Sequence, residues 1–98
     1  MVKLSDGTWE RLKKLFSAEN QNEAATLLIK ECGNNLPFLE NANEYQLERF
    51  RFAALKLSDG DINKLLDAVI LAQRDGRDLL MRAGFANSVT AHEKWLTS

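Results

Sequence analysis

Hydrophobic and polar residues follow one another along the chain at the spacing of amphipathic helices. The first segment, residues 8–16, has its apolar side chains on one face: Trp9, Leu12, Leu15 and Phe16. Its basic side chains are expected on the opposite, solvent-facing side: Arg11, Lys13 and Lys14. Ser5 or Asp6 can cap the start of this helix, because both residue types are strong N-caps. The pattern therefore predicts a first amphipathic helix.

A second helix is predicted over residues 20–32. Its start is marked by Asn20 and Glu23, which have the spacing of a capping box, and Gly33 is expected to end it. The apolar positions between them cover a wide arc, so we expect this helix to contact neighbours on more than one side.

Residues 33–42 are predicted to form a long loop, because Pro37 has no backbone donor and disfavours a helical residue before it. Asn43 and Gln46 then form a capping pair at the start of a helix expected over residues 44–57. A strand would also fit the local alternation of apolar residues in this segment, but the alternation changes phase part of the way along. One strand face cannot bury both halves, so the pattern favours a helix.

Residues 59–83 carry the clearest pattern, because their apolar positions keep one helical phase throughout. Ser58 is expected to begin this helix, with Asp61 as its capping partner. We interpret the segment as one helix of about 24 residues, although the Asp75-Gly76 pair could kink or divide it.

The last part of the chain is predicted to dock on the core. Gly84 is expected to end the long helix by a Schellman-type cap, with Phe85 as the hydrophobic closure. A short helix is then expected over residues 88–96, with four side chains within reach of the core: Val89, His92, Trp95 and Leu96.

Composition supports a folded single domain. The chain has 98 residues, of which 45% are hydrophobic and 28% are charged. This length suits one compact core and is too short for two ordinary domains. We therefore predict an all-α fold with a single helical domain over residues 1–98, a bundle of about five helices packed around the long helix of residues 59–83.

Charge and cysteine content limit the classes of binding partner and the cellular compartments that we expect for this chain. Lys and Arg together number 13 and Asp and Glu 14, and the resulting net charge of -1 argues against strong binding to phosphate backbones. A single cysteine cannot form an internal disulfide, which fits a reducing compartment such as the cytoplasm. The start of the chain lacks the apolar run of a signal peptide, and no stretch is apolar enough to span a bilayer.

Residues that could carry catalysis are few and poorly placed for it. Cys32 lies in the last turn of its predicted helix, where the helix carbonyls disfavour a thiolate, and on the apolar arc of that helix, so we expect a buried structural thiol. His92 is the only histidine, so carboxylates would have to complete any metal site, and the spacings typical of zinc or di-iron sites are missing. We expect no enzymatic activity, no cofactor and no metal site.

Two sets of residues are candidates for binding. Gly76 falls on the buried face of its predicted helix, which indicates either a close helix crossing or a pocket for a small apolar ligand. The other residues expected at that pocket are Val69, Ala72 and Leu80. A second set could form an apolar patch for a partner: Tyr45, Phe52, Leu36, Phe38 and Leu39. The alternative for this second set is that its members cover one another within the chain.

These observations favour a noncatalytic protein-interaction or regulatory module that docks an apolar helical surface on a protein partner or on a second copy of itself. A nucleic-acid-associated regulator that uses the basic face of the first helix is the alternative from a different class. A small-ligand binder with its pocket near Gly76 is a third interpretation.

Overall fold

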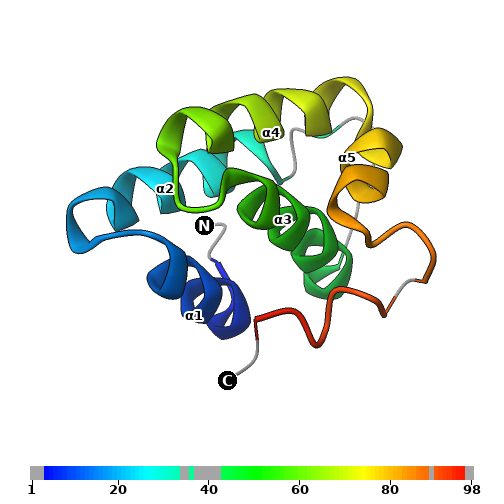
Figure 1. Cartoon of the computed structure of the whole chain (residues 1–98), viewed down its shortest axis with the longest axis horizontal. Helices are drawn as coiled ribbons and strands as arrows, with labels where there is room; N and C mark the ends of the chain where they lie inside the picture. Colours follow the sequence, from blue (N-terminus) through cyan, green and yellow to red (C-terminus); the bar gives the residue numbers. More distant parts are fainter. Residues whose placement is uncertain (1–3, 34–35, 37–42, 89, 97–98) are drawn as a thin grey trace.

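The computed structural model describes residues 4–33, 36, 43–88 and 90–96, and these residues contain five helices and no strand. In chain order the helices are α1 (Asp6–Leu15), α2 (Ala18–Glu31), α3 (Glu44–Ser58), α4 (Ile62–Arg74) and α5 (Gly76–Ala83). They pack around one core, so the predicted all-α bundle is confirmed (Figure 1). Within the described ranges, no helix combines the length and the apolar character needed to cross a membrane.

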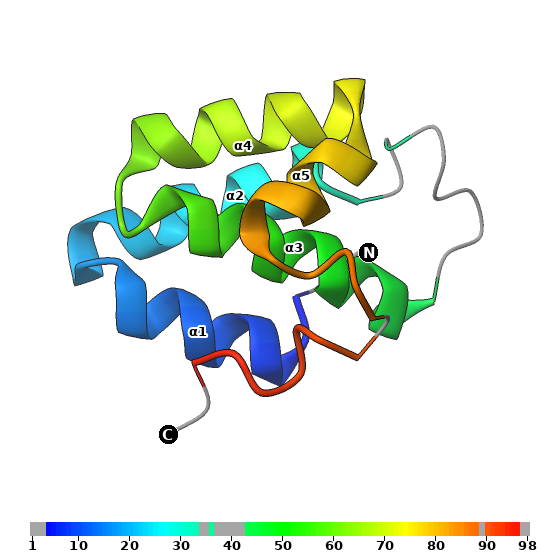
Figure 2. The ribbon, with the colours of Figure 1, turned by 45° about the vertical axis from the view of Figure 1, so that its right-hand side comes forward.

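The third helix, α3, lies at the centre of the bundle and packs against α1, α4 and α5 (Figures 1 and 2). Its buried apolar side chains point to several sides: Leu47, Phe50, Phe52, Ala53, Ala54 and Leu55. α2 packs against α1 and α4. α4, the first part of the predicted segment 59–83, also packs against three helices, α2, α3 and α5, so it shares the central packing role with α3.

The predicted long helix over residues 59–83 is divided into α4 and α5 at Asp75. The backbone of Asp75 leaves the helical region, with φ -155° and ψ 88°, and its carboxylate accepts a hydrogen bond from the N–H of Asp78 at 3.1 Å. This aspartate therefore ends one helix and caps the next. The division lets α5 turn back and pack against both α3 and α4 (Figure 2).

Two predicted helix boundaries are confirmed in atomic detail. At the start of α3, the Asn43 side chain accepts from the N–H of Gln46 at 2.8 Å, and the Gln46 side chain accepts from the N–H of Asn43 at 3.1 Å. At the end of α5, Gly84 adopts a left-handed conformation with φ 81°. The N–H of the buried Phe85 then donates to the carbonyl of Leu80 at 2.8 Å, as a Schellman motif requires.

Two other predicted helix starts are displaced. α4 begins after Asp61, whose carboxylate accepts from two backbone N–H groups of the first turn, at 2.8 and 3.1 Å. Ser58, the predicted start, is the last residue of α3, where its buried hydroxyl donates to the carbonyl of Leu55 at 2.6 Å. α2 begins at Ala18, ahead of the predicted start at Asn20.

The predicted helix over residues 88–96 does not form in the described part of this segment, where residues 90–96 make a series of tight turns. Its backbone bonds join residues three apart, as from the N–H of Ala91 to the carbonyl of Ser88 at 3.2 Å and from Trp95 to His92 at 3.1 Å. The segment runs from α5 across to α1 (Figures 1 and 2). It is docked as expected, since His92 is buried and Trp95 packs against the core.

Candidate functional site

The predicted partner-binding patch does not form one exposed surface among the described residues. Leu36 and Phe52 are buried within the chain, which is the alternative that the sequence left open for this set. Tyr45 keeps 38% of its surface exposed. Phe38 and Leu39 lie outside the described residues.

The residues proposed to surround a ligand pocket are all buried. Gly76 is the first residue of α5 and is buried where α5 turns away from α4. Val69, Ala72 and Leu80 are buried in the core cluster. The presence of a space beside Gly76 that could hold a small ligand stays a prediction.

Arg11 does not belong to an exposed basic face of α1, contrary to the sequence-based expectation. Its side chain is buried, and its guanidinium lies over the ring of Phe52, 4.1 Å from the centroid. Its nitrogens donate to three backbone carbonyls, those of Gly7, Glu93 and Trp95, at 2.8–2.9 Å. The residue is therefore a clamp that holds the C-terminal segment on α1.

Lys13 and Lys14 remain on the exposed side of α1, as predicted. The Lys14 ammonium donates to the carbonyl of Leu96 at 2.9 Å and lies 3.3 Å from the carboxylate of Glu10. The basic face of α1 is thus smaller than the sequence suggested, and part of it is engaged by the chain itself.

His92 is enclosed in an aromatic cage formed by Tyr45, Phe52 and Phe85. The imidazole is edge-on to these rings, with centroid separations of 5.1, 5.5 and 6.3 Å, and the residue is 1% exposed. Neither ring nitrogen has a hydrogen-bond partner among the described residues. Burial lowers the pKa of His92 below its ordinary value of 6.5, against the opposing effect of nearby Glu93 and Glu48.

The edge of this cage is closed by a bond between two side chains. The Tyr45 hydroxyl donates to the Glu93 carboxylate at 2.7 Å. That hydrogen bond raises the pKa of the Tyr45 phenol above 10.0, because the nearby carboxylate favours the protonated form. Tyr45 on α3 therefore helps to hold the C-terminal segment in place.

Cys32 has the structural setting that the sequence predicted. It follows the last residue of α2 and is fully buried. Burial raises the pKa of its thiol from 9.0 to about 12, and the positive charge of Arg51 offsets only part of that rise. A thiol with this pKa is not ionised at neutral pH and cannot act as a ready nucleophile.

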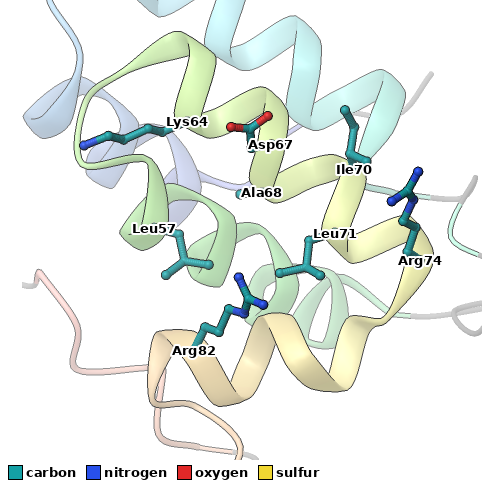
Figure 3. A pocket seen from close by; sticks show the side chains of 8 residues that line it. All are labelled: Leu57, Lys64, Asp67, Ala68, Ile70, Leu71, Arg74 and Arg82. Carbon is teal, nitrogen blue, oxygen red and sulfur yellow. The ribbon is translucent and has the colours of Figure 1, made fainter.

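The strongest candidate for binding is an open groove of about 440 Å³ between α4 and α5, beside the end of α3 (Figure 3). We call it the α4–α5 groove. Its apolar lining is Leu57, Ala68, Ile70 and Leu71. Its charged lining is Lys64, Asp67, Arg74 and Arg82. In Figure 3, Leu57, Leu71 and Arg82 point toward one another across the space between the helices.

Apolar side chains around this groove are open to solvent. Ile70 is 40% exposed, and Leu66, one helical turn earlier on α4, is 42% exposed. Leu57 and Leu71 are half-buried. A partner that covers the groove would therefore remove apolar surface from water.

The charges at the groove are mostly positive. Arg82 pairs with Asp78, with Nε 3.0 Å from the carboxylate. Lys64 and Arg74 are exposed, and neither forms an ion pair with another described residue. Asp67 is the acidic member of the lining.

The hydrophobic pattern along the chain did not indicate the α4–α5 groove. The pattern favoured one long helix over residues 59–83, and the groove forms only because the chain turns back at Asp75. Ile70 falls outside the apolar phase of its segment and was the available signal, since a large apolar residue on the polar side of a helix marks a patch that faces something other than the core.

The described residues hold no group of three or more His, Cys, Asp or Glu side chains that could bind a metal ion. Comparisons with known proteins give no further assignment: no family model, no curated protein and no solved structure matches the chain.

Proposed function

We propose that the chain is a noncatalytic interaction module that binds a protein partner through the α4–α5 groove. The observation that supports this proposal is the open apolar lining of the groove, with Ile70 at its edge 40% exposed. Leu66 extends the same apolar surface along α4. In contrast, the surface formed by Arg11 and the aromatic cage already holds the C-terminal segment of the chain itself.

The size of the groove suits an apolar side chain or two of a partner helix. A volume of about 440 Å³ falls in the range of roughly 300–1,000 Å³ that small binding sites occupy. Full burial of a leucine or isoleucine side chain contributes about 1.5–3 kcal/mol, so a few such contacts supply a useful binding energy. Ile70 and Leu71 would be among the groups covered.

A noncatalytic role is supported by the chemistry of the lining. The described residues of the groove include no histidine, cysteine, serine, threonine or tyrosine, and Asp67 is the single carboxylate among them. The nucleic-acid alternative loses one of the three cations of its predicted basic face, because the Arg11 guanidinium is buried and bound to carbonyls. The cytoplasmic location suggested by the lone cysteine remains part of the proposal.

A peptide-display selection tests this function. A library of random peptides of about 16 residues, long enough to form helix when bound, is selected on the folded chain. Binding of the enriched peptides is then compared on the Ile70→Ser variant and on the matched Met81→Ser control, which removes a side chain 65% exposed outside the groove. We expect Ile70→Ser to weaken binding at least about fivefold and Met81→Ser to leave it unchanged. Equal binding to both variants would contradict the proposal.

A further inference from the structure

We infer that the segment that occupies the α4–α5 groove is an acidic amphipathic helix, in which a stripe of apolar side chains is flanked by carboxylates. This inference rests on the proposed function and adds the chemistry of the partner. The apolar lining of the groove carries three cationic side chains and one carboxylate: Lys64, Arg74, Arg82 and Asp67.

The cations are placed to flank a docked segment. Lys64 and Arg74 lie near opposite ends of α4, about 15 Å apart at a rise of 1.5 Å per residue. Between them, the apolar side chains of Leu71 and Leu57 face the open space (Figure 3). An occupant helix of three to four turns would place its apolar stripe on these leucines and a carboxylate near each cation.

The two end cations are available to a partner. Neither Lys64 nor Arg74 is held in an ion pair with a described residue, whereas Arg82 is partly neutralised by Asp78. Carboxylates brought to Lys64 and Arg74 would therefore gain attraction without breaking an existing pair. A segment that covered the apolar floor would also displace water from between the charges, which would strengthen the attraction at close range.

Two other occupants fit the groove less well. In a symmetric dimer through this groove, each copy would bring the same cations to the interface, and like charges placed opposite one another oppose association. The phosphates of a nucleic-acid backbone would be attracted by the cations. They would also be repelled by the Asp67 carboxylate, and the apolar side chains of the floor offer them no hydrogen bonds. An acidic amphipathic helix uses both the apolar and the cationic parts of the lining.

The peptide selection tests this inference through the charge of the enriched sequences. At a salt concentration of about 0.15 M, we expect them to carry a net negative charge and apolar residues at helical spacing. The double variant Lys64→Glu with Arg74→Glu should bind these peptides at least about tenfold more weakly and select basic peptides instead. The matched control, Lys13→Glu with Lys30→Glu, changes net charge equally on exposed residues outside the groove and should still select acidic peptides.

The outcomes separate this inference from the proposed function. Enriched peptides that are neutral or basic, yet weakened by Ile70→Ser, would overturn the acidic partner and leave the groove as the docking site. Peptides that bind Ile70→Ser as well as the unaltered chain would overturn both. A selection that enriches no binder on the folded chain, verified by circular dichroism, would also contradict both.

Discussion

Arg11 on α1 donates a hydrogen bond from Nε to the carbonyl oxygen of Trp95 at 2.8 Å, which joins the first helix to the end of the described chain. The same guanidinium donates to Glu93 and Gly7 and stacks on Phe52 of the central helix. Three parts of the chain that are far apart in sequence therefore meet on one buried cation. The C-terminal segment forms turns and not a regular helix, and the hydrogen bonds from Arg11 hold these turns against α1.

Replacement of Arg11 by methionine should release the C-terminal segment. The aliphatic part of the side chain is kept, but three carbonyls lose their donor, so we expect the free energy of unfolding to fall by about 2–4 kcal/mol. Urea denaturation measures the loss, and amide hydrogen exchange over residues 90–96 should speed up selectively. Lys13→Met, on the exposed side of α1, is the control. Unchanged stability and protection in Arg11→Met would refute the clamp.

The burial of His92 predicts that stability depends on pH. Its pKa is lowered in the folded state below 6.5, so the unfolded chain binds a proton more readily. Stability should therefore be full above about pH 7 and decrease as the pH falls through 6.5 toward the folded-state pKa. The charged groups that face the imidazole are Glu93, Glu48, Arg49 and Arg11.

Urea denaturation at several pH values checks this dependence. In the window from about pH 5.5 to pH 7.5, above the range where carboxylates titrate, the His92→Leu variant should show a flatter profile. Its neutral side chain has no proton to gain. Identical pH profiles of the variant and the unaltered chain would show that burial of the His92 imidazole does not cause the pH dependence of stability.

Gly60 and Gly84 share a left-handed backbone but differ in their surroundings, which makes them a matched pair. A Cβ on Gly60, with φ 80°, would lie 2.5 Å from the carbonyl oxygen of Leu15, whereas a Cβ on Gly84 would meet nothing closer than the Lys56 ammonium at 3.7 Å. Gly84→Ala should cost about 1–2 kcal/mol from the backbone conformation alone. Gly60→Ala should cost at least about 1 kcal/mol more, as measured by thermal unfolding. Equal costs would contradict the close approach of α1 to the α3–α4 turn.

The thiol of Cys32 should be inert in the folded chain. Burial raises its pKa to about 12, so both access and the thiolate fraction are low. At about pH 8, a disulfide reagent such as Ellman's reagent should react with it only after denaturation. Rapid reaction of the folded chain would show that the end of α2 opens readily.

Local chemistry predicted those features of the fold that depend on neighbours in sequence. The capping box of Asn43 and Gln46 and the left-handed stop at Gly84 each involve residues a few positions apart, and both appear as expected. Burial of Cys32 followed from its place on an apolar helix face.

Features that depend on distant partners could not be predicted. Arg11 is buried because carbonyls from the other end of the chain meet it, and its helical spacing alone indicated solvent. An aspartate at position 75 is compatible both with the exposed face of a continuous helix and with the cap of a new one. The packing of α5 on α3 favours the second arrangement. The α4–α5 groove exists because of that turn, so an interpretation with one continuous helix could not include it.

Binding of a partner segment in the α4–α5 groove would bring the two molecules close enough for intermolecular nuclear Overhauser effects between them. The measurement uses a peptide enriched on the folded chain and chain methyl groups labelled with carbon-13. We expect contacts from the apolar side chains of the peptide to the methyls of Leu57, Ile70 and Leu71. Contacts confined to Met81, or to methyls elsewhere on the chain, would contradict binding in this groove.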